Sequence, residues 1–315
     1  MCAQLLVTNR ARTLFARLLT WMRLCSYPPM RIVCSSFRIG VVGGCSIMGQ
    51  RFLNSDHTFA LCAYGESPYL EECLASLIAQ TVKTNILIAT STPNDHIETI
   101  ARRYGVPLHI NDGAPGISHD WNCAVSHCKT PLVTIAHQDD VYLPSYAEAV
   151  LNSVNGSGRP LIFFTNYGEI RDGRSVDDVR ILKVKRLLLS PLKIRCLRKF
   201  KAVKRGVLSL GSSICCPSVT LCLPNLSNPI FLEGMKCNLD WEAWERASRR
   251  EGEFLYDQRI LMRHRIHEGS ETTSLIENDV RSQEDYVMLC KFWPSLIARA
   301  VWKFYVTSQS SNSCL

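Results

Sequence analysis

From His57 onward, the apolar positions of the chain alternate between two spacings. Short apolar runs of strand length are followed by segments of helical spacing, and the pattern recurs about every 20 to 25 residues. It predicts strands at 57–64, 86–90, 108–110 and 132–136. It predicts helices from 68 to about 78, from about 94 to 104 and from 118 to 128. Strands that alternate with helices indicate an α/β fold with a mostly parallel, Rossmann-like sheet and helices on both faces.

The predicted helix ends carry their own signals. Ser67 is expected to cap the first helix, with Pro68 at its first position and acidic residues in its first turn. The second helix is expected to begin at about Asn94 and to stop at Gly105.

Polar residues follow three of the predicted strands. In an open parallel sheet, ligands bind beyond the carboxyl ends of the strands. The candidate segments are residues 63–68, 90–94 and 137–142. The third contains Asp139 and Asp140, two carboxylates that repel each other unless a cation neutralises them. Mg²⁺ or Mn²⁺ would suit these oxygen ligands and could bridge to a diphosphate, and the alternative is a solvated turn.

Four segments resemble the motifs of the family 2 glycosyltransferases, in the family's order. Residues 58–81 resemble its opening strand, turn and helix, which ends in Gln-Thr. Residues 137–140 are similar to its Asp-x-Asp-Asp metal motif, with the last two positions intact. Residues 239–246 (LDWEAWER) resemble the helix start that holds its general base, and residues 263–272 (RHRIHEGSET) resemble its closing Arg-x-His segment.

The resemblance implies a GT-A fold, in which a nucleotide-sugar-binding half is fused to an acceptor-binding C-terminal half. It implies that Asp140 ligates the metal and that Asp139 contacts the metal or the ribose. Asp240 would be the base in an inverting displacement. Arg265 and His267 would stabilise the diphosphate charge, and His267 would also be a candidate metal ligand.

Four further residues are expected at the donor substrate by resemblance, namely Ala63, Tyr64, Glu66 and Asn122. The sequence also departs from the family. Its usual carboxylate after the second strand is replaced by Ala89-Thr90-Ser91, and Tyr64-Gly65 replaces the common Tyr-Asn. His137 stands where an Asp often stands, and Leu239 replaces the Glu before the base. These departures leave the donor open, with a UDP-sugar expected first.

Charge is unevenly distributed along the chain. The formal net charge is +8, residues 1–57 contribute +6, and residues 183–205 contribute ten cations and no acid. The sum could suggest nucleic acid, but no uniform basic face is evident. The first segment resembles a transit peptide or a surface-lying helix, and the favoured alternative is a natural start downstream, for instance at Met48.

The expected organisation has four parts. They are a poorly ordered basic extension (1–56), the nucleotide-sugar-binding half (57–165), the acceptor-binding half (166–275) and a C-terminal helical tail (276–315). The acceptor half includes a basic helix at 183–205, which is either a solvated helix or a contact with an anionic membrane. Trp241 and Trp244 are expected in its core.

The fifteen cysteines mostly lie in apolar runs, no CxxC pair occurs, and their number is odd, which favours free thiols in a reducing compartment. No apolar run approaches about 18 residues, so no transmembrane helix is predicted. We therefore expect a cytoplasmic protein, with peripheral contact at the cytoplasmic membrane face as an option.

The sequence favours an enzyme that transfers a sugar to a glycan or lipid-linked acceptor in cell-surface polysaccharide synthesis. A catalytically silent sugar-nucleotide-binding or scaffold protein is the alternative. A nucleotidyltransferase is disfavoured, because no Gly-rich phosphate loop with a Lys follows the first strand.

Overall fold

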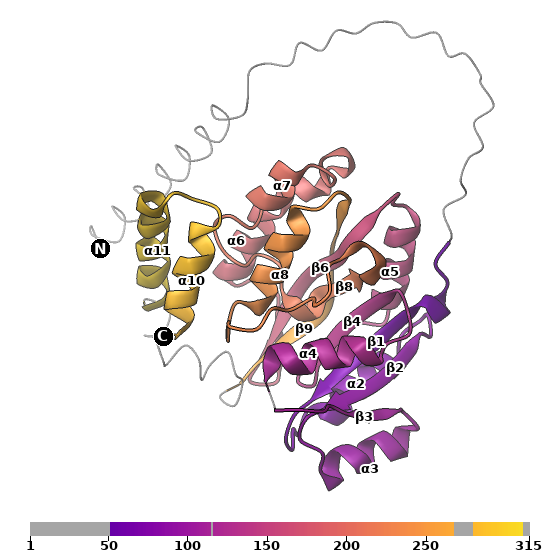
Figure 1. Ribbon diagram of the computed structural model, residues 1–315. Coiled ribbons are helices and arrows are strands. Elements are labelled where there is room, and N and C mark those ends of the chain that lie inside the picture. Colours follow the sequence, from indigo (N-terminus) through magenta and orange to yellow (C-terminus); the bar gives the residue numbers. More distant parts are fainter. Residues whose placement is uncertain (1–50, 115, 268–279, 311–315) are drawn as a thin grey trace, which may run out of the picture. The chain divides into compact units, whose positions relative to one another are not determined.

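One nine-stranded sheet runs through the part of the chain that the structure describes (Figure 1). The computed structural model describes residues 51–114, 116–267 and 280–310, all within the unit Gly49–Leu315. The strand order is β3-β2-β1-β4-β8-β6-β9-β5, with β7 paired to β6. The strands are β1 (His57–Ala63), β2 (Asn85–Thr90), β3 (Leu108–Ile110), β4 (Leu132–His137), β5 (Val141–Tyr142), β6 (Pro160–Arg171), β7 (Arg174–Val176), β8 (Val219–Cys222) and β9 (Glu253–Ile266).

The sheet is mostly parallel, as the alternating pattern predicted. Strand β1 pairs in parallel with β2 and β4, and β2 pairs in parallel with β3. Strand β8 runs antiparallel to both β4 and β6, so β6 points the same way as β4. Strand β9 is parallel to β6. The carboxyl ends of β1, β2, β3 and β4 therefore meet at one edge of the sheet.

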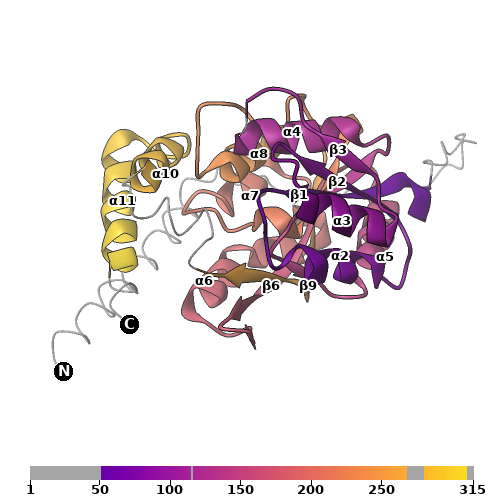
Figure 2. The ribbon, with the colours of Figure 1, turned by 90° about the horizontal axis from the view of Figure 1, so that it is seen from below.

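Helices cover both faces of the sheet, which confirms the α/β fold class (Figure 2). Apolar side chains of α2, α3 and α5 pack on one face, and those of α4 and α8 pack on the other. The helices are α2 (Leu70–Ile78), α3 (Asp95–Tyr104), α4 (Ile117–His127), α5 (Tyr146–Asn155), α6 (Arg180–Leu188), α7 (Lys201–Gly206), α8 (Leu239–Ser248), α10 (Val280–Cys290) and α11 (Ser295–Ser310).

Helix ends follow the sequence signals at α3 but not at α2. Asn94 caps α3 by accepting a hydrogen bond from the amide of Ile97 (2.9 Å), and Gly105 ends it in the left-handed conformation. Helix α2 begins at Leu70, after the expected cap at Ser67. The reason is that the Ser67 hydroxyl accepts from the Tyr69 amide two residues on (3.3 Å), which makes a local turn instead of a helix cap.

The second half of the described chain adds β6, β8 and β9 to the sheet and packs α8 against it. Trp241 and Trp244 on α8 are each 1% exposed, as expected for core residues. Helices α10 and α11 fall in the expected helical tail, and Met288, Leu289 and Ala298 join the same core. No helix in the described ranges is both long enough and apolar enough to span a bilayer.

The basic stretch 183–205 is not one helix. It divides among the end of α6, two 3₁₀ turns (Ser190–Lys193 and Arg195–Leu197) and α7. Pro191 interrupts the helical pattern, because proline has no amide hydrogen to donate. Lys204 within this stretch is fully buried, and its ammonium donates to the carbonyl oxygens of Arg250 (2.7 Å) and Gly252 (2.8 Å).

Residues 51–56, which the sequence analysis grouped with the N-terminal extension, contact the folded unit. The backbone of Phe52 exchanges two hydrogen bonds with the Asn155 side chain at the end of α5 (2.8 and 3.0 Å). A 3₁₀ turn, Asn54–Asp56, then leads into β1. The rest of the predicted extension, residues 1–50, lies outside the described residues.

A chain of buried polar groups crosses the sheet from β1 to α5. His57 Nε2 lies 2.8 Å from the Thr134 hydroxyl, which lies 2.6 Å from that of Thr220. The Tyr146 hydroxyl reaches the same Thr220 oxygen at 3.2 Å. Burial lowers the pKa of His57 to about 3, so the ring is neutral at physiological pH.

This histidine predicts a loss of stability in acid. Its folded pKa of about 3 lies below the ordinary 6.5, so the unfolded state binds one more proton throughout that window. The free energy of unfolding should fall by up to about 1.4 kcal/mol per pH unit from this group as the pH drops below 6.5. Urea unfolding at pH 7, 6 and 5 should show a shallower decline for His57→Gln than for the wild type. Parallel pH profiles would contradict the assignment.

Candidate active site

The candidate site lies where the turn between β4 and β5 meets the end of β9. Residues 138–140 form this turn, and β5 pairs antiparallel with β9 through Val141 and Arg263. That pairing brings His264 and Arg265 beside Asp140, although they are more than 120 residues apart in the sequence. The predicted metal motif and the predicted closing segment therefore share one place in the fold.

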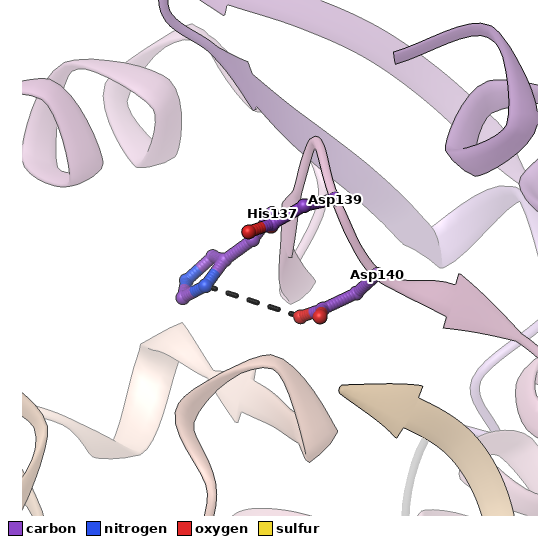
Figure 3. Close-up of side chains that lie close together, drawn as sticks. All are labelled: His137, Asp139 and Asp140. Atoms are coloured by element: carbon purple, nitrogen blue, oxygen red, sulfur yellow. Dashed lines mark ion pairs between the residues drawn. The ribbon is translucent and has the colours of Figure 1, made fainter. Parts of the chain in front are cut away.

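Asp140 is fully buried, and its two oxygens have different surroundings. Oδ1 accepts hydrogen bonds from His264 Nδ1 (2.8 Å) and from the amide of Arg265 (3.0 Å). Oδ2 has no hydrogen-bond partner among the described residues. His137 Nδ1 lies 4.0 Å from Oδ2 (Figure 3). A buried carboxylate oxygen without a donor is costly, so this position favours a cation.

The pKa values of the two histidines at Asp140 are shifted in opposite directions. Burial alone would lower the pKa of His264, but the charge of Asp140 and the hydrogen bond to it hold that pKa above its ordinary value. Burial lowers the pKa of His137 to about 4, and the positive charge of His264 contributes. His137 is therefore neutral at physiological pH and does not compensate the charge at Oδ2.

Asp139 is held through its backbone and its side chain. Arg265 Nε donates to the Asp139 carbonyl (2.9 Å), and its Nη2 donates to Glu72 (2.6 Å). The same guanidinium lies over the ring of Tyr69, 4.3 Å from its centre. His267 Nε2 is 3.1 Å from Asp139 Oδ2. Arg265, expected at the diphosphate, thus positions the turn that carries the two acids.

A divalent ion would find three ligand atoms at this turn. One ligand atom each from His137, Asp139 and Asp140 lies within 4.8 Å of the others. Of the ligands expected from the sequence, Asp139 and Asp140 belong to this group. His267 lies next to Asp139, and His137 completes the group. The donor set and the partnerless Oδ2 of Asp140 fit a divalent cation.

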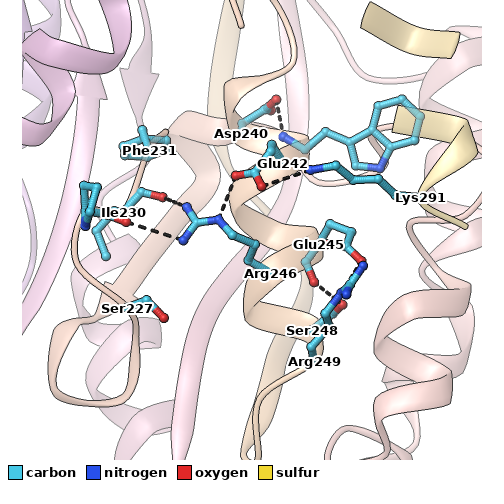
Figure 4. Close-up of polar contacts among 12 residues, drawn as sticks. Ser227, Ile230, Phe231, Asp240, Glu242, Glu245, Arg246, Ser248, Arg249 and Lys291 are labelled. Carbon is cyan, nitrogen blue, oxygen red and sulfur yellow. Dashed lines mark hydrogen bonds and ion pairs between the residues drawn. The ribbon is translucent and has the colours of Figure 1, made fainter. Parts of the chain in front are cut away.

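Asp240, the expected base, lies in the first turn of α8. One oxygen of Asp240, which Figure 4 labels, accepts from the Trp241 amide (2.6 Å). The other oxygen lies 3.5 Å from the Ser212 hydroxyl. Burial raises the pKa of Asp240 despite these hydrogen bonds.

Glu242, the other acid in the first turn of α8, is already neutralised. It pairs with Arg246 (2.8 Å) and with Lys291 (3.0 Å), as Figure 4 shows. Arg246 also donates to the backbone of Ile230, so this cluster ties α8 to the preceding segment and to the C-terminal helices. The contacts of Glu242 are those of a structural residue.

The residues expected at the donor by resemblance are spread along the same edge. Ala63 ends β1 and is buried, and Tyr64 is 58% exposed. The backbone N–H and C=O of Tyr64 both bond the Gln138 amide at 2.9 Å, which joins this turn to that of the acidic pair. Glu66 is exposed. Gly65 has φ +59°, a left-handed conformation that Gly adopts freely and Asn tolerates, which accounts for Gly at a position where Asn is common in the family.

Asn122 is not at the acidic pair. Its amide exchanges two hydrogen bonds with the backbone of Phe231 (2.7 and 3.1 Å), which ties α4 to the segment before α8. Asp120, two residues earlier, lies at the end of β2, where it accepts from Ser91 (2.9 Å) and Asn111 (3.0 Å). A carboxylate therefore stands at the edge where the second strand itself supplies none.

Sequence reasoning missed Asp120 and His264 and treated His137 only as a substitution. The first two become neighbours of the site through tertiary packing, and no spacing in the sequence signals it. His137 stands two residues before the acidic pair in the sequence. Because a neutral imidazole binds metal ions, the sequence alone could have suggested it as a metal ligand.

Comparisons with known proteins identify similar sequences and similar folds. The family model described as Glycosyl transferase family 2 matches residues 58–202. An uncharacterized glycosyltransferase of Rickettsia prowazekii (strain Madrid E) is 25% identical over 225 residues, which cover 70% of this chain and 67% of that protein.

Solved structures share the fold. Residues 1–349 of Staphylococcus aureus TarS in complex with UDP-GlcNAc match with a TM-score of 0.53 and 16% identity, over 80% of this chain and 71% of that one. The mannosyltransferase PcManGT of Pyrobaculum calidifontis, in complex with GDP-Man and Mn²⁺, matches with a TM-score of 0.55 and 14% identity, over 81% and 71%.

Fold and site together define a glycosyltransferase of the GT-A type. Residues 58–202 are the segment over which this chain is similar to glycosyl transferase family 2. The remaining motifs lie beyond that segment and are placed by the structure alone.

Proposed function

We propose that the protein is an inverting glycosyltransferase that moves a sugar from a nucleotide-sugar donor to a hydroxyl of a glycan or lipid-linked acceptor, in cell-surface polysaccharide synthesis. The observation that carries the proposal is the partnerless Oδ2 of buried Asp140, which belongs to a three-ligand group with His137 and Asp139.

The donor and the ion follow from the site and its relatives. One solved neighbour binds UDP-GlcNAc and another binds GDP-Man with Mn²⁺. We infer a UDP-sugar donor first and a GDP-sugar as the alternative, with Mn²⁺ or Mg²⁺ held by Asp139 and Asp140. The ion would supply Lewis-acid stabilisation of the leaving diphosphate.

Asp240 has the environment of a general base. It would accept the acceptor's hydroxyl proton while the acceptor oxygen forms a bond to the anomeric carbon. The bond from that carbon to the diphosphate oxygen breaks in the same step, and the nucleoside diphosphate leaves with the electron pair. A raised carboxylate pKa increases proton affinity, which suits this role. Glu242, held by two cations, is the weaker candidate.

The Asp240 assignment predicts a selective loss of chemistry. Asp240→Asn keeps the shape of the side chain and removes its proton affinity, so kcat for transfer should fall by roughly 10²–10⁴. The Kd for UDP should change less than twofold. Glu242→Gln is the matched control, and its kcat per folded molecule should stay near wild type. A kcat for Asp240→Asn within a few-fold of wild type would rule out Asp240 as the base.

We also infer that the protein contacts a membrane through the outward face of α6. Ile181, Val184 and Leu187 are 41%, 42% and 57% exposed, while Leu182 on the opposite side of the helix is buried. Residues 179–232 contain no Asp or Glu. An exposed apolar helix face surrounded by cations is better suited to bind an anionic lipid surface than to pack against another basic segment of the chain, which would repel it.

The inner side of α6 links this face to the site. Lys185 Nζ lies 3.0 Å from the Tyr167 hydroxyl, and the Tyr167 ring contacts that of His264. His264 in turn holds Asp140. A lipid-linked acceptor at the outer face of α6 would therefore lie within one helix diameter, roughly 10 Å, of residues that line the site.

The membrane inference predicts salt-sensitive vesicle binding. Changing Arg180, Lys193 and Lys199 to Gln should weaken binding to vesicles with anionic lipid by more than tenfold, at about 1 kcal/mol per cation. A control variant with Arg51, Arg102 and Lys129 changed to Gln removes the same charge elsewhere and should bind nearly as wild type. Co-sedimentation at rising salt measures both. Equal binding of the two variants, or no binding by wild type, would contradict the inference.

A further inference from the structure

We propose that His137 is a direct ligand of the divalent ion, and that its nitrogen makes the site prefer Mn²⁺ to Mg²⁺. The proposal rests on the metal site of the proposed function and adds the identity of a third ligand and the choice of ion. It assigns a role to a residue that stands where the family motif often has an Asp.

The distances suit a shared ion. His137 Nδ1 and Asp140 Oδ2 are 4.0 Å apart, and the ligand atoms of the three-residue group all lie within 4.8 Å of one another. Ligands about 2.1 Å from one octahedral ion lie roughly 3 Å apart when adjacent and roughly 4 Å apart when opposite. Small side-chain rotations would therefore bring all three onto one ion.

The imidazole is held in place before any ion arrives. Its ring stacks on Trp121 at 5.0 Å with an interplanar angle of 23°, and Trp121 meets Phe231 edge-on. His137 Nε2 is buried and has no hydrogen-bond partner within the described ranges. The other ring nitrogen, Nδ1, lies on the side of Asp140. A ring fixed by packing loses little freedom on binding a metal.

Asp140 offers only one oxygen to the ion. Its Oδ1 is occupied by His264 Nδ1 and the Arg265 amide, which leaves Oδ2 pointing toward His137. His264 is thus a positioning residue for a ligand, in the manner of outer-shell partners at many metal sites.

The ligand atoms of the site determine which divalent ion it prefers. Mg²⁺ prefers oxygen ligands and near-ideal octahedral geometry, and it gives up water reluctantly. Imidazole nitrogen suits transition metals, which bind mixed nitrogen and oxygen sites more readily. Replacing the motif's usual oxygen donor with an imidazole therefore shifts the preference from Mg²⁺ toward Mn²⁺.

Pulsed electron paramagnetic resonance of the Mn²⁺-loaded full chain tests the ligand directly. Wild type should show the ¹⁴N coupling of a bound imidazole. His137→Asp should still bind Mn²⁺ but lose that coupling, because an oxygen replaces the nitrogen. His109→Gln is the matched control and should keep it, since His109 lies on β3, stacked on His127 and outside the three-ligand group. Circular dichroism checks that both variants are folded.

Calorimetric titration with MnCl₂ and MgCl₂ tests the preference. The ratio of the Mg²⁺ Kd to the Mn²⁺ Kd should fall at least tenfold from wild type to His137→Asp. A ¹⁴N coupling that survives in His137→Asp, or that disappears in His109→Gln, would overturn the ligand assignment while leaving the proposed metal site standing. An absence of Mn²⁺ binding by wild type would overturn both.

Discussion

The pairing of β5 with β9 around a buried carboxylate is the interaction on which the site depends. Asp140 is fully enclosed, and a buried charge is tolerated only when hydrogen bonds or opposite charge compensate it. His264 and the Arg265 amide compensate one oxygen. They reach it because two residues of β5 add to the end of the long strand β9. The other oxygen keeps its need for a cation.

The same constraint joins the two expected halves of the enzyme. Strands from both halves lie in one sheet, since β8 pairs with β4 on one side and with β6 on the other. The carboxyl ends of β1 and β4 and the segment that carries Asp240 are therefore held in place by the same sheet. The basic stretch is divided by the same packing. Lys204, whose pKa burial lowers to about 8, supports the backbone after α8, while α6 turns an apolar face outward.

Much of the first half of the fold could be predicted from the sequence. Local periodicity and caps placed β3 and α3 within a residue of their observed bounds, because Asn94 and Gly105 act on their own neighbours. The prediction that Ser67 caps the first helix was wrong, because its hydroxyl accepts a hydrogen bond from the Tyr69 amide in a local turn before the helix. Arg265 and His267 were predicted through the resemblance of their segment, and the structure places both at Asp139. Asp139 and Asp140 were found, whereas His264 and Asp120 gain their places from strand pairing and helix packing that no short pattern encodes.

Binding of nucleotide with and without metal tests the central claim most directly. Isothermal titration of UDP and of GDP into the full chain, in buffer with MnCl₂ and in buffer with EDTA, compares the two states of the site. The account predicts that at least one nucleotide binds tenfold or more tightly with Mn²⁺, because the ion links the diphosphate to Asp139 and Asp140. Equal affinity in the two buffers would contradict it.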